Sequence, residues 1–148
     1  MPQPQFDRHQ LRLHALGERP NKVQIEQEQV LPGSRPARLE QAAMAQVREL
    51  AERMQQARAA QRPVMLAFGA HAIKNGLGPL LIRLMAEGWV SHLATNGAGI
   101  IHDWEFAYQG QSSEDVKTNV AEGRFGLWQE TGFNINLALL LGALDGLG

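Results

Sequence analysis

The sequence has no cysteine, few aromatic residues and no excess of charge of either sign. Without cysteine there is no disulfide, no zinc–thiolate site and no thiol nucleophile. The formal net charge of -1 lacks the basic excess that binding to nucleic acid or to an anionic membrane needs. No apolar run reaches the ~18 residues of a membrane span, and the polar start does not resemble a signal peptide. The simplest expectation is therefore a cytoplasmic α/β protein that binds neither nucleic acid nor membrane.

The chain of 148 residues has the length of about one domain. Residues 1–35 are predicted to be an N-terminal tail with a small hairpin, because Leu11-Arg-Leu13 and Val23-Gln-Ile25 both alternate. Turn formers between residues 31 and 36 then lead into the main α/β domain, predicted over residues 36–148.

Hydrophobic periodicity predicts the elements of this domain. A helix is expected over residues 36–61, followed by strand 64–68, helix 72–87, strand 89–95 and a helix over 100–108. Strand 64–68 is apolar at every position, which is typical of a strand buried on both faces. The first helix has one apolar stripe, formed by Leu39, Ala43, Val47, Leu50 and Met54.

The C-terminal part is predicted to be helical with one loop. Ser112 or Ser113 is expected to cap a short helix through Val120, and an apolar helix is expected over residues 134–144. Trp128 falls in the loop between them, as a lid or as an oligomer contact. Two parallel strands do not make a stable open sheet. Further strands in the N-terminal third, a longer chain or a partner would have to complete it.

Glycines and polar residues follow both predicted strands, at Gly69-Ala-His71 and from Thr95 to Asp103. Ligands of open parallel sheets bind at this carboxyl edge. Gly97-Ala-Gly99 is predicted to be a turn that opens a helix, and such a turn can admit a phosphate to backbone amides. His102 stands where the dinucleotide fingerprint has its third glycine. Spacing alone leaves open both nucleotide binding and a plain tight turn.

His71, His102 and Asp103 lie just past the two strand ends, where their side chains could converge. A metal site is one interpretation, because imidazole and carboxylate are ligands for zinc or iron. A general base with an orienting carboxylate is a second, and a pair of ordinary hydrogen-bonded histidines is the third.

The segment from residue 68 to residue 110 resembles deoxyhypusine synthase and its bacterial relatives. The resemblance rests on Gly69-Ala-His-Ala-Ile-Lys-Asn-Gly-Leu77, on Trp89-Val-Ser-His-Leu93 and on Thr95-Asn-Gly-Ala-Gly-Ile-Ile-His-Asp103. It implies a Rossmann-like parallel sheet with flanking helices that binds NAD at the strand ends. It also implies a homo-oligomer, a dimer or a tetramer, and oxidation of an amine or polyamine with aminobutyl transfer. The cofactor-binding residues would be His71, Asn75, Thr95, Asn96, Gly97 and Ala98.

Two departures from the family bear on the reaction. Ile101-His102 replaces a pair of glutamates, and none of the three lysines has the sequence context of the family's catalytic lysine. Catalysis would then be hydride transfer from a small amine substrate to NAD, with His102 or Asp103 as proton acceptor. The alternatives are a non-catalytic binding or assembly module of the same fold, and a metal-dependent hydrolase that uses His71, His102 and Asp103.

Overall fold

The computed structural model describes residue 5 and residues 7–147, so part of the predicted tail lies outside the described residues. The fold is mixed α/β, with one parallel and one antiparallel sheet. The chain divides into two compact units: unit 1 comprises residues 1–24 and 104–148, and unit 2 comprises residues 25–103. The domains predicted at 1–35 and 36–148 divide the chain differently and stay a prediction. Within the described residues, no helix is long and apolar enough to span a membrane.

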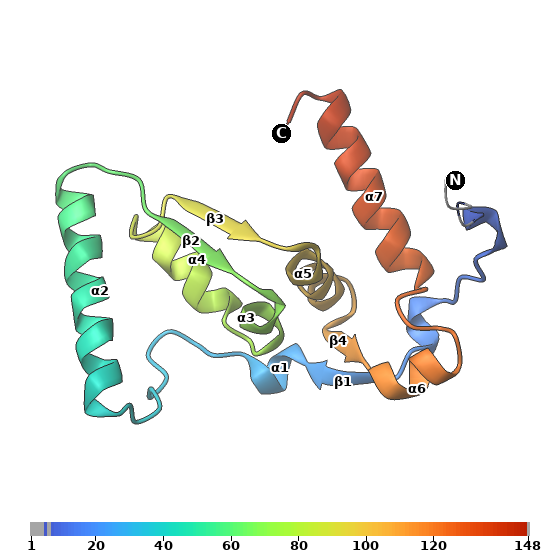
Figure 1. Cartoon of the computed structure of the whole chain (residues 1–148), viewed down its shortest axis with the longest axis horizontal. Coiled ribbons are helices and arrows are strands. Elements are labelled where there is room, and N and C mark those ends of the chain that lie inside the picture. Colours follow the sequence, from blue (N-terminus) through green and yellow to red (C-terminus); the bar gives the residue numbers. More distant parts are fainter. Residues whose placement is uncertain (1–4, 6, 148) are drawn as a thin grey trace. The chain divides into compact units, whose positions relative to one another are not determined.

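Unit 2 contains the predicted strand–helix–strand segment. Its strands are parallel and in register, with Met65 opposite His92 and Phe68 opposite Thr95, and Figure 1 shows them pointing the same way. The strands β2 and β3 are therefore confirmed, each slightly shorter than predicted. The elements are α1 Ile25–Glu28, α2 Gln41–Ala59, β2 Met65–Phe68, α3 Ala70–Lys74, α4 Gly78–Ala86 and β3 His92–Thr95, and α5 Gly97–Gln109 begins in this unit.

The predicted burial of the first strand on both faces is wrong. Exposed and half-buried residues alternate along β2, and Met65 is 65% exposed. Met65 and Ala67 lie on one face of β2 and are both exposed, so this face of the strand is open. Successive side chains of a strand point to opposite faces of the sheet. When one face is open, burial therefore alternates along the strand even if every residue is apolar.

The first helix is confirmed, but it begins at Gln41 and not at Pro36. Its apolar stripe is largely exposed, and none of its nineteen residues, all of them described, is buried. At its C-terminal end the Arg58 guanidinium lies 4.3 Å from the centre of the Trp89 ring. This cation–π contact joins α2 to the segment that precedes β3.

The single helix predicted over residues 72–87 is in fact two helices, α3 and α4, separated at Gly76. Gly76 has φ +76°, a left-handed conformation that ends a helix and that glycine adopts without steric cost. The backbone of residues 28–30 passes directly against it. The Gly76 carbonyl accepts a hydrogen bond from the Val30 N–H at 3.0 Å, and an added Cβ would lie 2.0 Å from the Glu28 carbonyl oxygen.

In unit 1 the predicted N-terminal hairpin does not form, and the strands pair with segments that are distant in sequence. Strand β1 pairs antiparallel with β4, with Val23 opposite Ser112, and His14 forms an isolated bridge with Trp128. The hairpin prediction is wrong because alternating apolar and polar residues indicate a strand but do not show which strand it pairs with. The elements are two 3-10 helices, Arg8–Gln10 and Leu16–Glu18, with β1 Asn21–Gln24, β4 Gln111–Glu114, α6 Val116–Ala121, α7 Gln129–Leu144 and the second half of α5.

The helix predicted to start at Ser112 or Ser113 begins later. Both serines are buried in β4, and Asp115 is the N-cap of α6. The Asp115 carboxylate accepts a hydrogen bond from the Thr118 N–H at 2.8 Å and pairs with the Lys22 ammonium at 2.7 Å. The hydrogen bonds from Lys22 and from the Thr118 backbone lower the pKa of Asp115 to about 2.

Glu105 is the centre of a buried polar cluster in unit 1, a role the sequence did not indicate. Its carboxylate is 1% exposed and accepts two hydrogen bonds from the Arg19 guanidinium, at 2.9 and 2.6 Å. The hydroxyls of Ser112 and Thr131 donate to the same carboxylate at 2.6 and 2.9 Å. Burial raises the pKa of Glu105, but the hydrogen bonds from Arg19 and Ser112 and the Arg19 charge outweigh it, so the pKa lies below its usual value.

Trp128 packs beside this cluster. Its side chain is 4% exposed, and the Arg19 guanidinium lies 5.3 Å from its ring centre. The prediction of a loop lid is therefore wrong. Trp128 belongs to the core of unit 1 and immediately precedes α7, which starts five residues earlier than predicted.

Candidate functional site

The carboxyl ends of β2 and β3 meet at one edge of the parallel sheet. Because Phe68 and Thr95 are opposite one another, the following residues, Gly69 and Asn96, leave the sheet at the same end. An open hollow of about 480 Å³ lies there. It is lined by Ala67, Phe68, Gly69, Ala94, Thr95 and Asn96. The hollow therefore lies at the edge where the sequence predicts a ligand site, and the ligand itself stays a prediction.

The N-terminus of α5 lies at this edge and gives it a partial positive charge. The turn predicted at Gly97-Ala98-Gly99 is the first turn of α5, and the Asn96 side chain caps it by accepting the Gly99 N–H at 3.0 Å. The first amides of a helix have no acceptor inside the helix and form its positive end. Gly97 and Ala98 are both exposed. Their backbone N–H groups are therefore available to an anion.

Gly99 allows Thr95 to lie against this first turn. A Cβ at Gly99 would be 2.3 Å from the Thr95 hydroxyl oxygen. Gly99 is buried although it belongs to a surface turn. The glycine at this position therefore sets how closely the end of β3 and the start of α5 approach one another.

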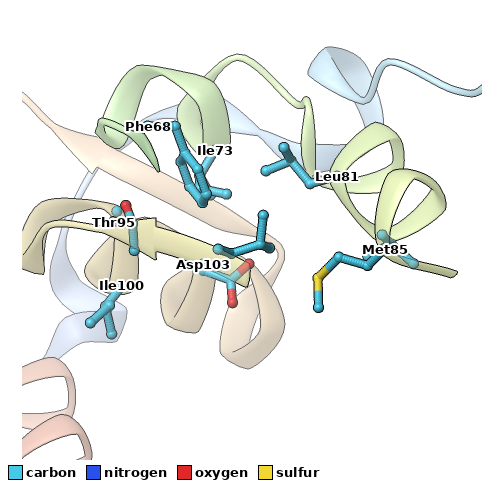
Figure 2. Close-up of a pocket in the computed structure, with 11 residues that line it drawn as sticks. Phe68, Ile73, Leu81, Met85, Thr95, Ile100 and Asp103 are labelled. Carbon is cyan, nitrogen blue, oxygen red and sulfur yellow. The ribbon is translucent and has the colours of Figure 1, made fainter. Parts of the chain in front are cut away.

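A second cavity adjoins the first and shares Phe68 and Thr95 with it. Its volume is about 300 Å³, and its walls come from β2, β3 and helices α3, α4 and α5. Figure 2 shows the Asp103 carboxylate among apolar side chains that include Ile73, Leu81 and Met85. Asp103 is the one charged residue among the described residues that line this cavity. The remaining lining residues are Gly78, Ile82, Leu93, Gly99 and Ile100.

The predicted site residues are only partly brought together. Of the predicted cofactor residues, Thr95 and Asn96 line the hollow. Gly97 and Ala98 follow directly in the first turn of α5, while His71 and Asn75 are exposed on α3 and at its end and line neither cavity. Of the predicted catalytic residues, Asp103 lines the apolar cavity; half-buried His102 lines neither.

The structure gives no support to the predicted metal triad. Among residue 5 and residues 7–147, no three histidine, aspartate or glutamate side chains are grouped closely enough to hold a metal ion. His71, His102 and Asp103 therefore do not form the grouping on which the metal-dependent hydrolase depended.

The apolar walls of the cavity were not singled out as site residues from the sequence. Leu81 and Met85 were recognisable as inward-facing positions of a helix, because their spacing of four places them on one face. Leu81 and Met85 line a cavity because the helix is interrupted at Gly76. The helical periodicity does not reveal this interruption.

Comparison of the chain with protein-family models, with curated proteins and with solved structures finds no match.

Proposed function

We propose that the chain is a deoxyhypusine synthase-like, Rossmann-like protein that binds NAD through the segments over residues 69–76 and 95–103. The observation that carries this proposal is the in-register parallel pairing of Phe68 with Thr95. It makes both segments leave the same edge of the sheet, where the hollow lies. Dinucleotides bind at this edge in open α/β sheets.

The start of α5 suits the cofactor's diphosphate. The exposed amides of Gly97 and Ala98 offer N–H donors at the positive end of a thirteen-residue helix. Both residues are small, which lets a phosphate approach the backbone closely. Asn96 holds the turn in shape through its bond to Gly99, and the Thr95 hydroxyl offers a further polar contact in the hollow.

The adjoining cavity suits an amine with an apolar tail. Its walls would cover the hydrocarbon part, and the Asp103 carboxylate would pair with the ammonium group. Oxidation to an imine removes a hydride from the carbon next to nitrogen and a proton from the nitrogen. NAD, when bound, would supply the hydride acceptor. The Asp103 carboxylate would take the proton from the nitrogen. Asp103 suits this role better than His102 because it lines the cavity.

A non-catalytic binding or assembly module of the same fold is the second candidate. Exposed apolar residues on α2 and α7, such as Leu50 at 59% and Leu144 at 82%, favour it, because they suit contact with another protein surface. The expected homo-oligomer, dimer or tetramer, and the expected cytoplasmic location belong to either candidate.

Replacing Ala98 by glutamate should weaken NAD binding at least ~10-fold while preserving the fold. A carboxylate in the first turn of a helix is favourable for the helix dipole, but it would repel the diphosphate. Isothermal titration of the purified chain with NAD at millimolar concentration should show saturable binding for the wild type and at least a ~10-fold weaker affinity, about 1.4 kcal/mol, for Ala98→Glu.

The matched control is Ala98→Gln, which adds nearly the same bulk as glutamate but no charge. It should lose less affinity than Ala98→Glu, because only the glutamate repels the diphosphate. Absence of saturable binding by the wild type would overturn the proposal. Equal losses in the two variants would show that bulk, and not charge, decides binding.

Replacing Asp103 by asparagine should remove amine oxidation and leave NAD affinity unchanged. Asparagine keeps the shape of the side chain but neither pairs with an ammonium group nor accepts its proton. A panel of alkyl amines and polyamines, followed by NADH absorbance, should show a loss of about 10²-fold or more in turnover. Turnover that survives Asp103→Asn would exclude this role, and NAD binding without turnover of any amine would favour the non-catalytic module.

A further inference from the structure

Helix α7 of unit 1 has an unpartnered apolar stripe opposite the face that contacts the buried cluster. Thr131 of α7 donates to Glu105 and marks the inner face. On the outer side, exposed apolar residues recur at spacings of four, three and four. A helix with apolar residues on all sides is normally covered on all sides. The stripe consists of Phe133, Leu137, Leu140 and Leu144, which are 65%, 39%, 64% and 82% exposed.

Three of the four stripe residues form one wall of a groove, and Leu144 lies beyond it. The groove has a volume of about 490 Å³, and Leu11 and Leu13 form its opposite side. Phe133, Leu137 and Leu140 line it, whereas Leu144 does not. One helix thus presents an apolar groove along most of the stripe and an exposed apolar side chain, Leu144, at its C-terminal end.

We propose that this surface is a dimer interface in which α7 packs antiparallel against α7 of a second copy of the chain. A twofold axis near the middle of the stripe would place Leu144 of each copy against the groove of the other copy. Such a contact is self-complementary and closed. The spacing of four, three and four is that of a coiled-coil seam, in which side chains of one helix enter the gaps of the other. Phe133 would then face Leu144 of the second copy, and Leu137 would face Leu140.

The charges of α7 favour a second copy over a membrane surface. Between residues 125 and 148 the sequence has no lysine or arginine, and its acids are Glu130 and Asp145 at the two ends of the helix. Helices that lie on anionic membranes carry basic residues on their polar face. An antiparallel pair also places the positive end of each helix beside the negative end of the other.

The polar side chains of α7 do not oppose burial of the helix. The Asn134 and Asn136 amides donate to the carbonyls of Glu130 and Gly132 within the helix, at 2.8 and 2.7 Å. Polar groups that already have partners can be desolvated at small cost.

The exposed apolar area is sufficient for a stable dimer. Leu141 flanks the stripe at 51% exposure, and Leu11 and Leu13 of the groove are 40% and 52% exposed. With the stripe, these side chains offer an area on the order of the ~800 Å² per partner that a standard interface buries.

Sedimentation equilibrium of the full chain tests the interface. The wild type should be a dimer, and Leu140→Glu should raise the dissociation constant at least ~10-fold, equivalent to about 1.4 kcal/mol. The matched control is Leu139→Glu. Leu139 is the same residue type on the same helix and is also 64% exposed, but it lies off the stripe. This variant should remain dimeric. Leu144→Lys, at the most exposed position of the stripe, should behave like Leu140→Glu and is compatible with a helix C-terminus.

Single-cysteine variants test the orientation, because the chain has no cysteine of its own. Oxidation of a mixture of Phe133→Cys and Leu144→Cys chains should give the mixed disulfide, with little linkage in either variant alone. A monomeric wild type would overturn the proposal, whether or not it binds lipid vesicles or another protein. A dimer that Leu140→Glu and Leu139→Glu leave equally intact, or one in which Phe133→Cys chains link to one another, would also overturn it.

Discussion

Alanine at position 105 should lower the free energy of unfolding by about 3–5 kcal/mol, because it leaves the buried Arg19 charge without its partner. Arg19 is 6% exposed and has its two terminal nitrogens on the Glu105 carboxylate. Ser112 and Thr131 would lose the same acceptor. Urea unfolding followed by circular dichroism at one fixed chain concentration measures the change.

The control is Glu49→Ala, which removes a carboxylate from an exposed pair. Glu49 and Arg53 are 60% and 73% exposed, and such pairs contribute about 0–1 kcal/mol. If Glu105→Ala cost no more than Glu49→Ala, the cluster would not stabilise the fold.

Acid should weaken the same cluster. The pKa of Glu105 is lowered in the folded chain, so its contribution is present above the unfolded pKa of about 4.3 and is lost as the pH falls through the lower folded value. The free energy of unfolding should therefore fall on acidification below this range, and Glu105→Gln should depend less steeply on pH there.

Gly76→Ala should destabilise unit 2 by about 2–4 kcal/mol, for two reasons that add. The residue has φ +76°, which is unfavourable for alanine, and the new Cβ would lie 2.0 Å from the Glu28 carbonyl oxygen. Because that oxygen is part of the backbone, relief requires the segment at residues 28–30 to move away. Loss of the hydrogen bond from Val30 to Gly76 should follow, and hydrogen exchange at the Val30 amide reports it.

Gly88→Ala separates the two contributions. Gly88 has a similar φ of +71°, but a Cβ there would meet nothing within 4 Å. Its cost should be only that of the left-handed conformation, about 1–2 kcal/mol. Equal costs at Gly76 and Gly88 would contradict the account of the close approach.

The spacing of apolar residues predicted those helices and strands that form from residues close together in sequence. The apolar runs at β2 and β3, the amphipathic pattern of α2 and the helix after Gly99 all follow from periodicity within one segment. The carboxyl edge of the sheet as the position of a hollow also followed, because parallel strands place their ends together.

Features that depend on distant residues could not be predicted in this way. Arg19 and Glu105 are 86 positions apart, and neither has a local pattern that marks it as buried. The pairing of β1 with β4 likewise joins segments far apart in sequence. The break at Gly76 depends on the backbone at Glu28, so a continuous helical pattern over residues 72–87 was misleading.

Amide chemical shifts measured during titration with NAD test most directly whether the strand ends of unit 2 form an NAD site. Saturable shifts are expected at Gly69, Asn96, Gly97, Ala98 and Gly99. No saturable shift at millimolar NAD, or saturable shifts that leave these five amides unchanged, would contradict it.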